Sequence, residues 1–239
     1  MHSSCLSFFL SRLAKCPWTT LLLATVKIRL LTFLILATTC LAQQDKPDIK
    51  TLEKEAEAGD TAAQIALGLA YDKGNGVTQD RRKAAEWFQK AAEKGAVEAQ
   101  FNLGTMYQAG VGVKKNDAKA FEWFEKAAEQ GFADAQFNVA VMYAEGRGTE
   151  KNPVRALNWY DKAAIQGMTR AQFNLGLIYA FGKGVPANSL KAYAWFSAAA
   201  ADGDPAAKKN CAFIESKATP EQLEQLKKVA ADLATKIKK

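Results

Sequence analysis

Residues of the kinds that perform catalysis or bind metals are scarce in this sequence of 239 residues. The single histidine, His2, and three of the four cysteines, Cys5, Cys16 and Cys40, lie among the first 42 residues, so that only Cys211 lies beyond them. Ser-His-Asp and Cys-His catalytic centres and His-bearing metal sites need side chains that this remainder lacks. It also lacks a Ser-x-x-Lys pair. We therefore predict a protein that is not an enzyme, with no catalytic residue, no metal and no cofactor.

Polar and aromatic side chains instead recur at a fixed spacing of 36 residues. In one set, each asparagine follows a phenylalanine: Phe101 and Asn102, Phe137 and Asn138, Phe173 and Asn174. An asparagine amide can donate to and accept from the backbone of an extended peptide, while apolar neighbours hold the side chains of that peptide. These six residues are the candidate partner-binding site. The alternative is that the phenylalanines pack between repeats and the asparagines tolerate solvent.

A second recurring set is basic: Lys83, Lys119, Arg155, Lys191, Lys90, Lys126 and Lys162. Such a stripe could bind an acidic partner. The alternative is a solvated helix face in which these residues pair with Glu86, Glu122 or Glu129, each pair contributing a few tenths of a kcal/mol. Cys211 occupies the position of Leu67 in this period, which predicts a buried and unreactive thiol.

The period itself is marked by glycines without any insertion: Gly59, Gly95, Gly131, Gly167 and Gly203. A period of 20–50 residues indicates a solenoid, in which each unit packs mainly on its neighbours. The predicted organisation is a signal peptide at 1–42, an N-terminal linker and capping helix at 43–58, four repeats at 59–94, 95–130, 131–166 and 167–202, and a partial fifth repeat with a C-terminal capping helix at 203–239.

Each unit has the hydrophobic pattern of two helices. Ala63, Leu67 and Tyr71 lie on one helical stripe, and a second stripe runs through the segment 84–92. Glycine pairs such as those in 110–112 can adopt the positive φ angles that end a helix. Residues suited to N-cap the second helix follow at Asp80, Asn116, Asn152 and Asn188. We expect an all-α fold: an α/α right-handed superhelix (solenoid) of antiparallel helix pairs with 36-residue repeats.

The residues between Ala99 and Ala128 resemble a known repeat. The pattern Ala-Gln-Phe-Asn-Leu-Gly-x-x-Tyr, Gly-x-Gly-Val, Lys-Ala and Trp-Phe-x-Lys-Ala-Ala is similar to the Sel-1-like repeat, a relative of the tetratricopeptide repeat. The resemblance covers about four-fifths of the chain and implies an adaptor or assembly platform, often exported in bacteria, whose first helices line a concave groove. A cysteine-rich branch of the family is associated with penicillin binding and β-lactamase activity, but it pairs cysteines in each repeat and this chain does not.

The N-terminal segment has the order of a secretion signal. Lys27 and Arg29 precede an apolar run over residues 30–42 that ends in small residues at Ala42. These 13 residues are fewer than the roughly 20 that cross a bilayer as a helix. We predict cleavage after Ala42 and a periplasmic or secreted protein. The alternatives are an anchor formed by residues 17–42 and lipidation at Cys40.

Residues 1–25 are surplus to such a signal, which could begin at Val26. The formal net charge of +7 is concentrated in the signal, where four basic residues and no acid leave +3 for the remainder. That small excess does not favour nucleic acid as a partner. We predict a monomer that meets membranes only through its signal segment and binds a protein or peptide partner in the groove. The alternative functions are an enzyme of cell-wall or β-lactam chemistry and a peptidoglycan- or carbohydrate-binding module.

Overall fold

The structure is a computed structural model that describes residues 48–237. The predicted signal peptide, its cleavage site at Ala42, the lipidation alternative at Cys40 and the linker up to residue 47 lie outside the described residues. The chain divides into two units, Met1–Asp48 and Ile49–Lys239. The second unit contains the helical repeats.

Residues 48–237 form eleven α-helices and no strand. Their bounds are α3 (Ile49–Glu57), α4 (Thr61–Lys73), α5 (Arg81–Glu93), α6 (Val97–Ala109), α7 (Asp117–Glu129), α8 (Ala133–Glu145), α9 (Pro153–Ile165), α10 (Thr169–Phe181), α11 (Ser189–Ala201), α12 (Pro205–Glu215) and α13 (Pro220–Ala234). We call α4, α6, α8, α10 and α12 the A helices, and α5, α7, α9 and α11 the B helices. Helix α3 precedes the first A helix as a B helix precedes each later one.

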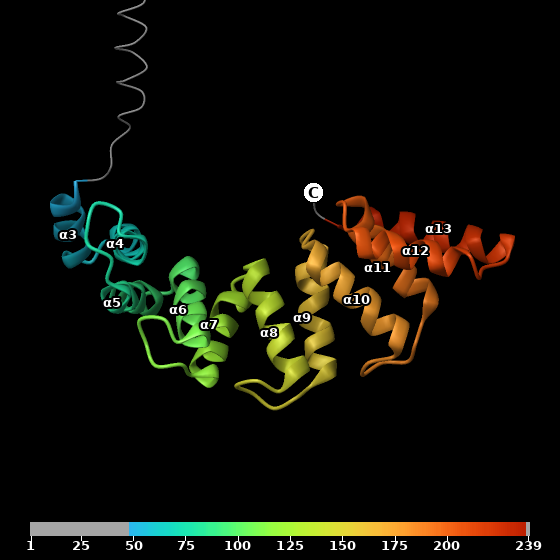
Figure 1. Cartoon of the computed structure of the whole chain (residues 1–239), viewed down its shortest axis with the longest axis horizontal. Helices are drawn as coiled ribbons and strands as arrows, with labels where there is room; N and C mark the ends of the chain where they lie inside the picture. The colour runs from blue at the N-terminus through green and yellow to red at the C-terminus, as the bar shows by residue number, and fades with distance from the viewer. Residues whose placement is uncertain (1–47, 238–239) are drawn as a thin grey trace, which may run out of the picture. The chain divides into compact units, whose positions relative to one another are not determined.

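From α3 to α12, consecutive helices lie side by side along the array (Figure 1). Each A helix of the four full repeats packs on the B helix that follows it and on the helix that precedes it. The predicted all-α solenoid of helix pairs with a 36-residue period is confirmed. Because contacts run between neighbours, each repeat depends on the next for its buried surface.

Residues next to the helix ends form hydrogen bonds with the free backbone groups there, as the sequence predicts. Asp80, Asn116, Asn152 and Asn188 N-cap the B helices, and their side chains accept hydrogen bonds from backbone N–H groups of the first turn. Gly110 ends α6 in the left-handed conformation, with φ of 70°. At Gly112 the backbone lies so close to the carbonyl of Arg81 that a Cβ would overlap it. The A-to-B loop is therefore held against the start of the preceding B helix.

Close contact between the two helices of a repeat requires a small residue on the A helix. A Cβ added to Gly104 would lie 2.8 Å from Cδ1 of Phe124, and one added to Gly176 would lie 2.5 Å from Cδ1 of Phe196. In the third repeat the same position is Ala140, which is completely buried. Phe124 and Phe196 are among the most buried large side chains, so these contacts form the centre of each repeat.

Buried glutamines connect the A helix of each full repeat to the helix before it. Their Nε2 atoms donate to backbone carbonyls at distances of 3.0 to 3.2 Å, in the pairs Gln64 to Ala56, Gln100 to Ala92, Gln136 to Ala128 and Gln172 to Ala164. These carbonyls belong to the last turn of a helix, and each also accepts from the N–H of the glycine three residues later. The glutamines therefore supply a second hydrogen bond to carbonyls at helix C-termini inside the protein.

The C-terminal end departs from the repeat. Helix α13 starts after a short loop with a capping box at Thr219, and it packs on α11. In the full repeats a B helix covers the small residue of its own A helix, whereas the equivalent Ala212 on α12 is exposed. Cys211 is consequently half-buried rather than fully buried. Its burial, with a smaller contribution from the charge of Glu215, raises the pKa of its thiol to about 11, so the unreactive protonated form dominates at neutral pH.

Candidate functional site

Three hollows recur at equivalent places along the array. Each is lined by the A and B helices of one repeat and by the A helix that follows them. The N-terminal hollow, of about 240 Å³, lies between repeats 1 and 2 and includes Asp72, Arg81, Phe88 and Asn102. Seven of its nine lining positions recur 72 residues later in a larger hollow between repeats 3 and 4. Seven of the nine also recur 108 residues later, in a hollow at the C-terminal end.

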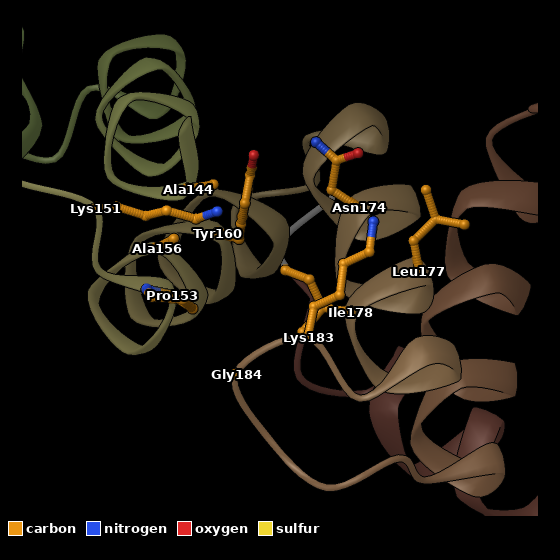
Figure 2. A pocket seen from close by; sticks show the side chains of 10 residues that line it. All are labelled: Ala144, Lys151, Pro153, Ala156, Tyr160, Asn174, Leu177, Ile178, Lys183 and Gly184. Carbon is orange, nitrogen blue, oxygen red and sulfur yellow. The ribbon is translucent and has the colours of Figure 1, made fainter. Parts of the chain in front are cut away.

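The central hollow, between repeats 3 and 4, has a volume of about 550 Å³. Figure 2 shows the Lys151 side chain extending towards Tyr160 and the Lys183 side chain extending towards Asn174. Lys151 comes from the loop before α9 and Lys183 from the loop after α10. Ile178 on α10 is among the apolar residues that line it. The hollow thus combines apolar walls with two ammonium groups and two uncharged polar groups.

Tyr160 lines the central hollow, and its hydroxyl lies beside Asn174 (Figure 2). Its side chain is buried, and burial is the main reason that its pKa is raised to about 12. The charge of Glu145 also raises this pKa, while a hydrogen bond with the Asn174 side chain lowers it. The tyrosine hydroxyl and the asparagine amide therefore lie close together in the hollow.

The C-terminal hollow, between repeat 4 and α12, has a volume of about 530 Å³ and is lined by no charged residue. It shares Leu177 with the central hollow. Phe181 and Phe213, which line it, are 69% and 65% exposed, the largest values among the exposed large apolar side chains. A strongly apolar surface therefore adjoins the central hollow.

The predicted asparagines lie at equivalent positions on α6, α8 and α10, and all three are half-buried. Asn102 lines the N-terminal hollow and Asn174 lines the central one. Each of these two is therefore placed to contact a ligand in its hollow. A binding role for Asn102, Asn138 and Asn174 stays a prediction.

The predicted phenylalanines are half-buried and pack on aromatic rings of their own repeats. The ring centroids are 5.6 Å apart for Phe101 and Phe124, 5.7 Å for Phe137 and Tyr160, and 5.6 Å for Phe173 and Phe196. Phe101 also contacts Phe132 of the next repeat, at 5.0 Å. These contacts give the rings a packing role, and partner binding by Phe101, Phe137 and Phe173 stays a prediction.

Sequence reasoning missed several residues of the hollows. Asn210 continues the asparagine set by 36 residues and lines the C-terminal hollow. Tyr160 stands where the other repeats have phenylalanine, at Phe88, Phe124 and Phe196. Both signals were available from the repeat alignment within the chain. Lys151 and Lys183 had no such signal, because their loops bring them to one place only in the folded array.

The basic set lies over aromatic rings instead of pairing with the predicted acids. Lys90, Lys126 and Lys162 place their Nζ atoms 3.8 to 4.1 Å from the ring centroids of the tryptophans three residues earlier. The other members lie 5.0 to 5.6 Å from tyrosines of the A helices: Lys83 over Tyr71, Lys119 over Tyr107, Arg155 over Tyr143 and Lys191 over Tyr179. The expected ion pairs with Glu86, Glu122 and Glu129 are not formed within the described residues. Cation–π contacts are the reason.

Two further features bear on the kind of site that the array offers. Within residues 48–237, no group of three or more His, Cys, Asp or Glu side chains is placed to hold a metal ion. None of the helices in this range is both long enough and apolar enough to cross a membrane.

The helix pairs, their loops and their glutamines match a family model. The Sel1 repeat model matches four consecutive segments, residues 61–95, 97–132, 133–168 and 169–204. The chain belongs to the Sel1 repeat family. Each matched segment begins two residues after the predicted start of a repeat, at the A helix itself. Sel1 repeat proteins are generally protein-interaction scaffolds.

Solved structures of other Sel1 repeat proteins resemble this one. A Sel1 repeat protein from Oxalobacter formigenes is 33% identical, with a TM-score of 0.65 over 90% of this chain and 84% of that one. The protective antigen c5321 of uropathogenic Escherichia coli is 31% identical, with a TM-score of 0.52 over 79% of this chain. The alignment spans 48% of c5321, about half its length. No curated protein sequence matches this one.

Proposed function

We propose that this Sel1 repeat protein is a scaffold that binds an extended segment of a protein partner along its A helices. The observation that carries the proposal is the recurrence of hollows at one place in repeats 1, 3 and 4. A ligand that follows the array meets the same kind of site more than once, and repeated weak contacts on one ligand add to its affinity. Recurring hollows suit an extended chain better than a compact small molecule.

The asparagines supply the polar part of this recognition. Asn102, Asn174 and Asn210 each line a hollow, and an amide group offers both a donor and an acceptor. An extended peptide exposes backbone N–H and C=O groups that need such partners when water is displaced. Apolar residues beside them, such as Leu177, would cover the ligand's side chains. The selectivity of the site then depends on the residues that differ between hollows.

The test is capture of partners from a cell-envelope extract by matched variants. Replacing Asn102, Asn138 and Asn174 with alanine should weaken capture of a given partner by tenfold or more, while the melting temperature changes little. The matched control replaces Lys83, Lys119 and Lys191, which lie over tyrosine rings. If the lysine variant loses the partner and the asparagine variant keeps it, the groove proposal is wrong. Hydrolysis of nitrocefin by the purified chain would instead favour the enzyme alternative.

We also propose that the scaffold acts outside the cytoplasm, after cleavage of the signal peptide at Ala42. The support is the order of charged, apolar and small residues in the leader. Mass spectrometry of the chain from the periplasm or medium should find an N-terminus at Gln43. An intact leader on a cytosolic form would refute export, and diacylglycerol on Cys40 would establish the lipoprotein alternative.

A further inference from the structure

The charges that line the hollows differ in whether they have partners. In the N-terminal hollow, Arg81 lies 3.6 Å from Asp72, so the acid and the base neutralise each other. The central hollow is lined by Lys151 and Lys183 and by no acid. Neither lysine forms an ion pair with a carboxylate in the described part of the chain. The central hollow therefore carries two positive charges that nothing in its lining balances.

An acid does lie near this hollow, but it has a partner of its own. Glu145 influences Tyr160 through its charge. Its carboxylate lies 3.8 Å from Nε of Arg147, on the loop that also carries Lys151. The local balance around the central hollow thus remains positive, and an anionic group that enters it meets favourable charge on two sides.

The uncharged polar groups point to the same ligand chemistry. The Tyr160 hydroxyl and the Asn174 amide line the same hollow as the two lysines, and each of these groups can donate a hydrogen bond. Two ammonium groups and one hydroxyl are all donors. A carboxylate is an acceptor only, and it can accept several hydrogen bonds at once. The donor set therefore matches a carboxylate better than an amide or an alcohol.

The C-terminal hollow, next to the central one, indicates what else the ligand must carry. The C-terminal hollow shares Leu177 with the central one, is lined by no charged residue and exposes Phe181 and Phe213. Nζ of Lys183 lies 5.7 Å from the centroid of the Phe181 ring, so the basic and apolar parts are in contact. Contiguous exposed apolar side chains next to polar groups are typical of interaction sites.

We infer that the central and C-terminal hollows together bind a segment of a partner protein that carries an Asp or Glu side chain near a large apolar side chain. The carboxylate lies between Lys151 and Lys183 and accepts from Tyr160, while the apolar side chain covers Phe181 and Phe213. This inference rests on the proposed function, because it names the ligand chemistry of the same groove. It commits to an acidic side chain within an extended segment.

The probe is a display library of random twelve-residue peptides, with free and blocked C-termini, selected on the purified chain. Enriched peptides should combine Asp or Glu with Phe, Leu, Ile or Trp. In the strongest synthetic peptide, replacing the acid with its amide should weaken binding at least fivefold, and the Lys151→Gln/Lys183→Gln variant should weaken it as much. Both losses should shrink as the salt concentration rises, because screening removes the charge contribution.

A matched control removes two lysines from the equivalent loop one repeat earlier. Lys115 corresponds to Lys151, Lys114 precedes it, and both are exposed and line neither the central nor the C-terminal hollow. The Lys114→Gln/Lys115→Gln variant should bind the same peptide within twofold of the original chain. Thermal unfolding of both double variants, monitored by circular dichroism, should show the original transition.

Each other outcome overturns a defined statement. Peptides without acids, or a requirement for a free C-terminal carboxylate, would refute the acidic side chain. The groove proposal would survive in that case if Asn102→Ala/Asn138→Ala/Asn174→Ala still lost binding. Unchanged binding by the Lys151→Gln/Lys183→Gln variant would refute the central hollow as the site. A selection that enriches no peptide would refute this inference and the groove proposal together.

Discussion

In the N-terminal hollow, Asp72 lies beside Arg81, and Phe88 forms part of the lining. At the same positions 72 residues later, the central hollow has Ala144, Pro153 and Tyr160. Both hollows are built on the same kind of helix pair, in which a glutamine of the A helix donates to the last turn of the helix before it. The comparison shows that the repeat architecture forms the hollow and that substitutions among its lining residues determine which ligand groups it can bind. In the N-terminal hollow the acid and the base neutralise each other, and the positions of Lys151 and Lys183 are occupied by the uncharged Gln79 and Val111. The central hollow has no such ion pair and carries the two lysines.

The largest expected effect concerns the scaffold that both hollows share. Trp123 lies on α7 between them and is 9% exposed. Trp123→Ala should lower the free energy of unfolding by roughly 3–5 kcal/mol through lost burial and a cavity. Trp87→Ala, at a half-buried position in the first repeat, should cost less. Urea unfolding measures both, and a Trp123→Ala midpoint equal to the original would refute the core role of this residue.

A second prediction concerns how stability depends on pH, because the central hollow has Tyr160 where the N-terminal hollow has Phe88. Because burial raises the pKa of Tyr160 to about 12, its contribution to stability is fully present below pH 10 and is lost as pH rises towards 12. Between pH 9 and 11.5 the original chain should lose about 1–2 kcal/mol more than Tyr160→Phe, which restores the residue of the N-terminal hollow. Urea titrations at the two pH values measure this difference. Equal losses in the two proteins would show that Tyr160 ionises freely.

The glutamine contacts also differ between the helices that carry Asn102 and Asn174. Oε1 of Gln100 accepts from Gln130 at 2.8 Å, whereas Oε1 of Gln172 is buried without a partner. The residue equivalent to Gln130 is Asp202, which cannot donate. Asp202→Gln should therefore raise the free energy of unfolding by about 1 kcal/mol.

The matched control for this change is Gln166→Asp in the preceding repeat. Nε2 of Gln166 donates to Oε1 of Gln136 at 2.8 Å and to the carbonyl of Gly131 at 3.0 Å. This variant should be destabilised by a similar amount. Thermal and urea unfolding of both proteins would contradict the argument if the two changes had the same sign.

The smallest effect is expected in the ion pair that distinguishes the N-terminal hollow. The side chains of Arg81 and Asp72 are 54% and 38% exposed, so solvent and salt screen their attraction. Asp72→Ala should change the free energy of unfolding by less than about 0.5 kcal/mol. A loss above 1 kcal/mol in urea unfolding would mean that the ion pair stabilises the fold. The charged residues of this hollow could then not be replaced without a loss of stability.

The helical periodicity and the recurring glycines were enough to predict the helix pairs, their N-caps at Asp80, Asn116, Asn152 and Asn188, and the solenoid. These features are local or repeat between neighbours, so each unit carries the information for its own fold. The alignment of the repeats with one another also contained Tyr160 and Asn210. Their role in lining the hollows could not be inferred from it, because that role depends on which face of the array they occupy. Periodicity places a residue on a stripe and does not say what covers that stripe.

The amino-acid sequence by itself determined the family, the period and the residues that pack, because spacing along a helix controls which side chains share a face. Only the tertiary structure decided what those side chains meet. It placed Phe101, Phe137 and Phe173 against rings of their own repeats, the basic set over tyrosines and tryptophans, and α13 on α11 so that Cys211 stayed half-buried. It also brought Lys151 and Lys183 from separate loops to one hollow. These contacts depend on how neighbouring repeats stack, since a local sequence pattern does not specify the distance between two loops.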